Sequence, residues 1–292
     1  MSLVPESFAP EAEVIVNSFE PVRRRTAGAF VASLGLAVLI GLGALACATE
    51  QSEAPEFQMP PPLTGDAEAP SAEEVLEKTV TFMSGLDNIA FDALVTYEVV
   101  QENGQTLHFD LVQRMMSARP DRLFWVTVRD DATVDSVWFD KGTFTMLKRP
   151  QDVYGQLEVS PTIEEMVDDL DYDYDIVVPF QDLLAGRARE LFLEPESVWY
   201  IGETWVMGTW THHVALRNED VDYELWIQKD GDPLPLRITI NWKHEKGGPS
   251  YVAHFRKWIT SPTFDDAMFV FTPPSDARQI EILPAMPLEE EY

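Results

Sequence analysis

The chain has 292 residues, of which 50 are Asp or Glu and 21 are Lys or Arg, so its formal net charge is −29. This charge argues against nucleic-acid binding, because Lys and Arg must neutralise phosphates, and against a protein that lies flat on anionic lipid. The single cysteine excludes an intramolecular disulfide, while eight Trp and sixteen Phe suffice for a packed core.

The N-terminal part of the chain predicts export and lipidation. Residues 1–22 are polar and acidic, and we expect them to be disordered. Residues 23–47 begin with three arginines, continue as an apolar run and end in small residues followed by Cys47. This pattern is typical of an export signal that ends at a lipidation site. We therefore expect Cys47 to carry lipid and to attach the protein to a membrane of the bacterial cell envelope, facing the periplasm.

Two alternatives remain open for the same segment. The tripeptide at residues 44–46 is also a small-residue cleavage site, which would release a soluble periplasmic protein. Residues 26–46 would span roughly 31 Å as a helix, enough for an uncleaved transmembrane anchor held by the positive-inside rule. Ala48, rather than aspartate, follows Cys47. By the enterobacterial sorting rule, a lipidated protein would then be an outer-membrane lipoprotein.

The rest of the chain divides into a tether and one domain. Residues 48–70 are rich in Pro, Glu and Ala and cannot bury a core, so we expect a tether. Residues 71–292 fit a single domain. That domain begins with a helix over residues 72–85, because Ser71 and Glu74 form a capping box before an apolar run at helical spacing.

The remaining sequence alternates with period two and predicts a series of strands. The first runs over residues 89–99, and Asn103-Gly104 is a hairpin turn signal before the second, at 107–111. Further strands are expected at residues 123–129, 134–140, 143–148, 153–159, 198–207, 209–217, 223–229, 236–242 and 250–259, with a final segment at 269–271. Turns are expected at 140–142, 208, 230–232 and 247–249. Residues 161–190 interrupt the series and predict two short helices, the first capped by Thr162 and the second with Pro179 in its first turn.

These elements predict a mainly β (α+β) fold. Consecutive strands with short links favour a large antiparallel meander of about ten to eleven strands. Twist would curve such a sheet into an unclosed half-barrel, lidded by the N-terminal helix and the central helical insertion. On one strand, Leu236, Ile238, Ile240 and Trp242 share a face, which indicates an apolar interior.

Six segments, in order and spacing, resemble a known family. They are residues 119–123 (RPDRL), 139–142 (FDKG), 179–184 (PFQDLL), 222–227 (DYELWI), 233–235 (PLP) and 269–274 (FVFTPP). Over about residues 71–282 the chain resembles domain-of-unknown-function family 2092, of predicted periplasmic proteins. The step at 119–123 followed by an aspartate turn is also similar to the LolA/LolB-like lipoprotein-carrier superfamily. That resemblance implies a helix-lidded half-barrel that holds acyl chains, with no assigned activity.

The sequence offers little for catalysis, a cofactor or a metal. It contains no nucleophile elbow, P-loop or dinucleotide fingerprint. His212 and His213 are neighbours on a strand, so they should point to opposite faces. The aspartates at 171, 173, 175 and 182 match four positions of a calcium loop, but Ile176 stands where the turn needs glycine. We expect a solvated acidic loop there, no enzyme activity, no cofactor and no metal site.

The expected function is non-catalytic binding or transport of a lipid or acylated ligand in the concave interior. Candidate ligand-binding residues are Phe91, Val95, Tyr97, Phe109, Leu111, Trp125, Trp226 and Trp242. Arg119 and Arg122 are either surface residues that pair with carboxylates or contacts to a headgroup or client. The alternative is an envelope sensor or assembly factor with a solid core that acts through a protein partner. An open apolar cavity would favour the first function, and an exposed apolar patch over a filled core the second.

Overall fold

The computed structural model describes residues 69–189 and 195–285. The predicted N-terminus, the export signal with Cys47 and nearly all of the tether lie outside the described residues. Within the described ranges, no helix has the length and apolar character needed to span a membrane.

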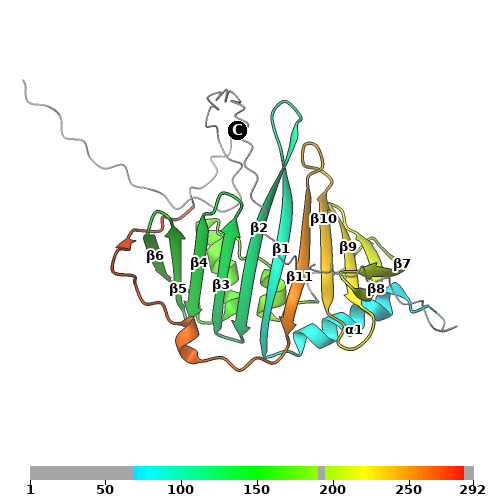
Figure 1. Ribbon diagram of the computed structural model, residues 1–292, viewed down its shortest axis with the longest axis horizontal. Helices are drawn as coiled ribbons and strands as arrows, with labels where there is room; N and C mark the ends of the chain where they lie inside the picture. Colours follow the sequence, from blue (N-terminus) through cyan, green and yellow to red (C-terminus); the bar gives the residue numbers. More distant parts are fainter. Residues whose placement is uncertain (1–68, 190–194, 286–292) are drawn as a thin grey trace, which may run out of the picture. The chain divides into compact units, whose positions relative to one another are not determined.

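The described residues form one open sheet of twelve strands (Figure 1), in the order β12-β6-β5-β4-β3-β2-β1-β11-β10-β9-β8-β7. Neighbouring strands are antiparallel except for β12, which runs parallel to β6. The strands are β1 Asn88–Val100, β2 Thr106–Ala118, β3 Arg122–Arg129, β4 Val134–Asp140, β5 Thr143–Arg149, β6 Val153–Glu158, β7 Ser197–Val206, β8 Thr209–Arg217, β9 Val221–Gln228, β10 Pro235–Trp242, β11 Ser250–Ile259 and β12 Arg278–Gln279. The predicted mainly β fold with an unclosed antiparallel half-barrel is confirmed.

The sheet consists of two meanders joined at its centre. Strands β1 to β6 are neighbours in chain order, and so are β7 to β11. The two meanders meet where β1 pairs with β11. Ala93 lies opposite Phe255, and Val95 lies opposite Ala253. This long-range pairing leaves β7 at one edge and the short β12 beyond β6 at the other, so the sheet does not close.

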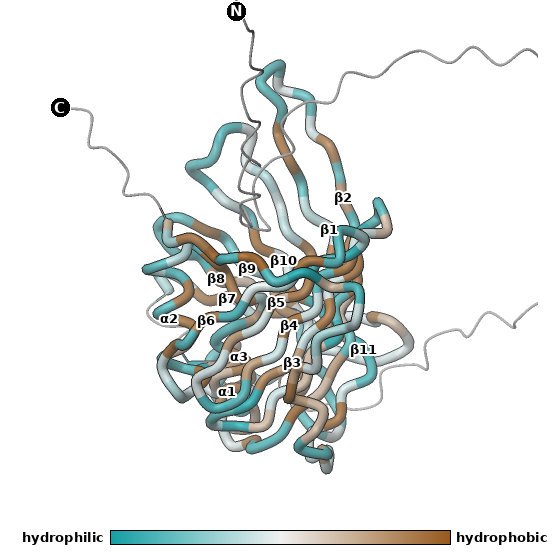
Figure 2. The backbone as a smooth tube through the Cα atoms, turned by 90° about the vertical axis from the view of Figure 1, so that its left-hand side faces the viewer, coloured by the Kyte–Doolittle hydropathy of each residue, from teal (hydrophilic) through white to brown (hydrophobic). Residues whose placement is uncertain are grey.

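The predicted hairpin turns are confirmed where glycine supplies a positive φ. Gly104, at φ +85°, turns β1 into β2, and this hairpin projects beyond the other strands (Figure 1). Lys141 and Gly142, at φ +49° and +102°, form the two-residue link between β4 and β5. Positive φ at both central residues matches the right-handed twist of the flanking strands. Figure 2 shows hydrophilic residues at the projecting tip and hydrophobic residues within the strands.

Helix α1 (Ala72–Ser84) carries the predicted capping box. The backbone N–H of Glu74 donates to Ser71 Oγ at 3.1 Å, and Ser71 N donates to Glu74 Oε2 at 3.2 Å. The reciprocal bonds satisfy two donors that the first turn of a helix leaves free. Val75, Leu76 and Met83 on one side of α1 are buried against the sheet.

The central insertion forms the two predicted helices, α2 (Ile163–Tyr174) and α3 (Gln181–Ala185). Both lie on the same face of the sheet (Figure 1). Pro179 was predicted in the first turn of α3, but it lies outside the helix and precedes the N-cap, Phe180. The acidic loop is also a wrong prediction, since Asp171 and Asp173 lie within α2. The helix ends at Asp175 in the left-handed region, and Asp175 N donates back to Asp171 O at 3.1 Å, the single bond of an αL-type ending.

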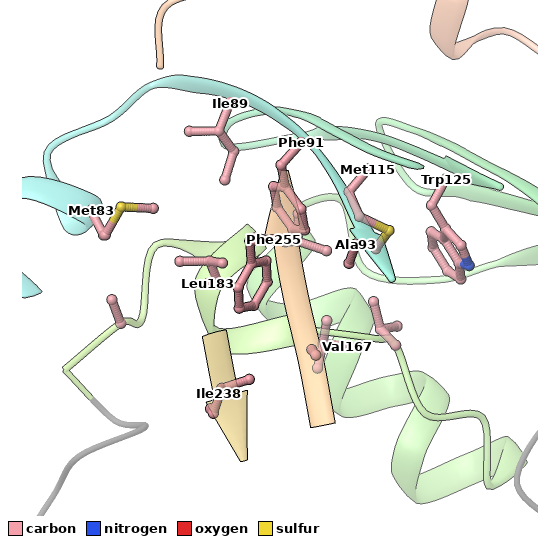
Figure 3. Close-up of a cluster of buried hydrophobic side chains, with 14 of the residues drawn as sticks. Met83, Ile89, Phe91, Ala93, Met115, Trp125, Val167, Leu183, Ile238 and Phe255 are labelled. Atoms are coloured by element: carbon pink, nitrogen blue, oxygen red, sulfur yellow. The ribbon is translucent and has the colours of Figure 1, made fainter. Parts of the chain in front are cut away.

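The hydrophobic core lies between the helices and one face of the sheet, which we call the inner face. Alternate residues of β1 point into it, including Phe91 and Val95, and Met115, Val137 and Phe144 extend it across the neighbouring strands. Figure 3 shows Phe91, Phe255 and Leu183 gathered at its centre. The opposite, outer face carries exposed valines such as Val112 and Val128.

The predicted final strand segment at residues 269–271 is absent. A short 3-10 helix, Asp266–Phe269, stands there instead, and β12 follows further along. Phe271 packs between Trp138 and Tyr154, with ring centroids at 4.9 and 5.0 Å. The apolar residues of this segment therefore cover side chains of the sheet rather than pair as a strand.

Candidate ligand cavity

A cavity of about 400 Å³ lies on the inner face, between the helices and strands β9 to β11. Its walls come from α1, from the segment around α3 and from the three strands. The lining residues are Thr79, Met83, Val177, Val178, Pro179, Phe180, Gln181, Asp182, Leu183, Ala188, Leu225, Pro235, Ile238, Ile240, Trp242, Tyr251 and Phe255. Volumes of about 300–1,000 Å³ with mostly apolar walls are usual for small-molecule sites.

The walls are suited to hydrocarbon rather than to charge. Ile238, Leu225 and Phe255 are buried apolar residues that face the cavity. Burial raises the pKa of the Tyr251 phenol far above its ordinary value, so this group stays neutral. The carboxylate in the lining, Asp182, lies 3.4 Å from the guanidinium of Arg187. A polar solute would find few partners on these walls, whereas an apolar chain would be removed from water.

Phe180 connects the cavity with the core behind it. It adopts φ +54° at the N-cap of α3, a conformation that costs energy in a bulky residue and is kept only when packing determines it. Its ring lies 5.0 Å from that of Phe255 and 5.7 Å from that of Phe91. The α2–α3 connection is therefore tied to the centre of the sheet by aromatic contacts.

The predicted ligand-binding residues divide between the cavity, the core and other places. Trp242 lines the cavity, with its ring 6.5 Å from Tyr251. Phe91 and Val95 are almost fully buried core residues behind the cavity. Leu111 and Trp125 line a second, smaller cavity of about 30 Å³ between the inner face and the α2–α3 connection.

Three predicted residues lie away from both cavities. Tyr97 and Phe109 stack on each other at 5.6 Å where β1 and β2 extend toward the projecting hairpin. Trp226 lies on the outer face, stacked on His213 at 4.2 Å and beneath the Arg237 guanidinium at 4.2 Å. The expectation that Trp226 faces the interior is wrong, because its neighbour Leu225 takes the inner position and successive strand residues alternate.

The structure gives Arg119 a set of main-chain partners. Its guanidinium donates to the carbonyl oxygens of Leu184 at 3.0 Å, Met83 at 3.1 Å and Leu183 at 2.5 Å, and to that of Leu86. These carbonyls lie at the C-terminal ends of α1 and α3, where helices leave acceptors unsatisfied. We assign Arg119 to the stability of the helical lid.

Arg122, the first residue of β3, pairs with carboxylates at that end of the strand. It forms an ion pair with Asp266, lies 3.7 Å from Asp121 and covers the ring of Phe269 at 5.3 Å. This is the surface pairing that the sequence allowed. A contact of either arginine with a headgroup or client is a prediction that nothing here tests.

Sequence reasoning did not select most of the cavity walls. Met83, Leu183 and Phe255 come from three distant segments that only the fold brings together. The alternation of Ile238, Ile240 and Trp242 was the available signal, and all three line the cavity. Leu236 departs from that alternation because it is the extra residue of a β-bulge between Pro235 and Arg237.

The histidines take separate places, as predicted for His212 and His213. The Tyr200 hydroxyl and His212 Nδ1 lie 2.9 Å apart, whereas His213 Nε2 lies 2.8 Å from Glu224 on the outer face. Burial lowers the pKa of His212, which keeps its imidazole neutral. Across residues 69–189 and 195–285, no three His, Cys, Asp or Glu side chains are grouped as metal ligands.

Comparison with known proteins gives a family match over most of the chain. The model of the family described as "Predicted periplasmic protein (DUF2092)" matches residues 72–283. No curated protein matches at a significant level. Similar solved structures include the Mycobacterium tuberculosis lipoprotein LppX, at 14% identity and TM-score 0.39 over 67% of this chain and 98% of that chain. Others are a LolA superfamily protein from Nitrosomonas europaea (11%, TM-score 0.33, 70% and 99%) and a chain of the Pseudomonas aeruginosa MucA/MucB complex (13%, TM-score 0.36, 69% and 61%).

Proposed function

This chain belongs to the DUF2092 family of predicted periplasmic proteins, and we propose that it binds the acyl chain of a lipid or acylated ligand without catalysing a reaction. It would work on the periplasmic side of the cell envelope. The observation that carries the proposal is the apolar cavity of about 400 Å³ on the inner face of the sheet. A solid core would leave no such space.

The energetic reason is the burial of hydrocarbon. Each methylene group transferred from water to an apolar site contributes about 0.8 kcal/mol. Neutral walls such as Ile240, Trp242 and Tyr251 offer this gain without selecting for a charged tail. A ligand with a flexible apolar chain fits this chemistry better than a sugar, a nucleotide or a peptide backbone.

The proposed attachment to the membrane suits such a ligand. Lipid on Cys47 and a tether over residues 48–70 would hold the domain within reach of a bilayer. Attachment to the outer membrane follows from Ala48 if the enterobacterial sorting rule applies. Radiolabelled palmitate incorporation that is lost in Cys47→Ser would support lipidation, and unchanged labelling would refute it.

A second candidate function has its own observation. Strand β7 is an edge of the sheet, and Trp199 and Ile201 on it are 66% and 57% exposed. An exposed apolar edge strand can pair with an extended segment of another protein. This favours an envelope sensor or assembly factor with a protein partner, which is compatible with ligand binding but does not require it.

Native mass spectrometry tests the first proposal. The full chain is released from the envelope fraction in a fluorinated detergent, and its mass is compared with the covalent mass. We expect a one-to-one adduct of lipid mass that is lost in Ile240→Asp, because this change places a carboxylate in the apolar cavity. Val112→Asp is the matched control, since Val112 is 47% exposed on the outer face.

The outcomes separate the two candidates. An adduct lost in Ile240→Asp but kept in Val112→Asp supports binding in the cavity, provided that near-ultraviolet circular dichroism shows the fold intact. A protein that shows only its covalent mass and takes up no added phospholipid refutes binding in the cavity. A co-purifying protein that is lost in Trp199→Ser, with the cavity empty, favours the second candidate.

A further inference from the structure

A row of polar side chains crosses the mainly apolar inner face. Gln113 on β2 pairs with Thr127 on β3, Thr127 with Asp135 on β4, and Asp135 with Lys148 on β5, all in register. Gln113, Thr127 and Asp135 are 4%, 5% and 6% exposed. Polar groups are rarely buried in this way without a partner or a purpose.

The row carries two cations for one buried carboxylate. Asp135 lies 2.7 Å from a guanidinium nitrogen of Arg129 and 3.9 Å from Lys148 Nζ. Burial lowers the pKa of Lys148, and the charge of Arg129 adds to this effect while Asp135 opposes it. Asp131, the next acidic group near Arg129, accepts hydrogen bonds from Thr133 instead. Within the row itself, two cations therefore face one buried carboxylate, although the protein as a whole has a net charge of −29.

One atom of the row lacks a partner. Gln113 Nε2 donates to Thr127 Oγ1 at 3.3 Å, but Gln113 Oε1 is buried without a hydrogen-bond donor among the described residues. The smaller cavity of about 30 Å³ lies against this amide and is also lined by Arg129 and Asp135. A buried acceptor of this kind is costly unless a bound group donates to it.

The polar row and the apolar cavity lie on either side of one short segment. Val177 and Pro179, in the connection between α2 and α3, line both spaces. A molecule with its apolar chain in the larger cavity would reach the row only by passing this segment. Two positive-φ residues, Asp175 and Phe180, bound this connection.

We propose that Gln113, Thr127, Arg129 and Lys148 form the headgroup subsite for an amphiphile with an oxyanion head, either a carboxylate or a phosphate. The inference rests on the proposed function, since the chain must occupy the larger cavity. Arg129 and Lys148 neutralise the anion, and Asp135 holds both cations in place. Gln113 Oε1 can accept from a P–OH or hydroxyl group of such a head, a donor that a bare carboxylate lacks.

Titration calorimetry with four probes tests the subsite. The full chain in fluorinated detergent, freed of bound lipid, is titrated with dodecanol, dodecanoate, dodecyl phosphate and inorganic phosphate. We expect the two anionic chains to bind about tenfold or more tightly than dodecanol, because charged hydrogen bonds add to the same apolar contact. Inorganic phosphate should bind far more weakly than dodecyl phosphate.

Lys148→Met is the informative variant, because it removes one charge, keeps the apolar stem and leaves the Arg129–Asp135 pair in place. It should reduce the affinity for both anionic chains about tenfold and leave dodecanol unchanged. Lys257→Met, a cation 72% exposed, is the charge-matched control and should change neither.

Several results would overturn the subsite. If the wild type binds dodecanol as tightly as dodecanoate and dodecyl phosphate, the headgroup subsite is refuted, although binding of the apolar chain still stands. Equal losses in Lys148→Met and Lys257→Met would indicate general attraction of anions. Inorganic phosphate binding as tightly as dodecyl phosphate would indicate a plain oxyanion site. Failure of every chain probe would refute the proposed function together with the subsite.

Discussion

Replacing Arg119 by methionine should lower the free energy of unfolding more than the loss of a single surface ion pair does. The guanidinium donates to the carbonyls of Met83, Leu86, Leu183 and Leu184, at the ends of α1 and α3. Its positive charge also lies at two helix C-termini, where the helix dipole favours cations. Methionine keeps the apolar stem and removes every donor.

The expected loss is about 3–5 kcal/mol. A net contribution of about 1 kcal/mol for each of the four hydrogen bonds gives about 4 kcal/mol. This is a large part of the ~5–15 kcal/mol that stabilises a typical domain. Urea denaturation followed by tryptophan fluorescence measures it.

Arg114→Met is the matched control. Arg114 pairs with Asp92 at 2.8 Å but is 55% exposed, so its loss should cost less than about 1 kcal/mol. If Arg119→Met costs no more than Arg114→Met, the carbonyl contacts do not hold the lid and the reasoning is refuted.

Three further predictions concern pH, the first helix and the cavity wall. Hydrogen bonds from Arg114 and Lys257 lower the pKa of Asp92 to about 2 despite its burial, so Asp92→Asn should cost about 1–2 kcal/mol at pH 7. Because the folded pKa lies below the unfolded one, this difference should vanish as pH falls from about 4 to 2; a difference that persists in acid contradicts the assignment. Ser71→Ala should cost about 1 kcal/mol in urea unfolding through loss of the N-cap, and an unchanged midpoint argues against the cap. Trp242→Ala should reduce the lipid adduct in native mass spectra while Trp226→Phe leaves it unchanged, and the reverse order would place the ligand on the outer face.

Local chemistry made parts of the fold predictable. The capping box at Ser71 and the turn at Lys141 and Gly142 depend on residues a few positions apart, so the sequence contains their full cause. Strand β2 was predicted only over 107–111 but extends from Thr106 to Ala118. Its second half contains Gln113, Arg114 and two methionines, which have little strand preference of their own and are held by pairing with β1 and β3.

The candidate site was less predictable than the fold. Alternation on strands predicts which large apolar side chains share a face, but alternation alone does not separate a core residue from a cavity wall. Phe91 and Val95 are core because the helical insertion covers them, whereas Ile240 and Trp242 border the space that it leaves open. Trp226 lies on the outer face because its neighbours on β9, Leu225 and Ile227, take the inner face.

Most element types, the hairpin turns and the mainly antiparallel character of the sheet are predictable from the sequence, because they follow from propensities and contacts within a few residues. The pairing of β1 with β11, the cover of the inner face by α2 and α3, and the alignment of Gln113, Thr127, Asp135 and Lys148 in one row appear only in the folded chain. These features depend on groups that are distant in the chain. Their contact energy becomes available only after the loops between them close, which no local pattern encodes.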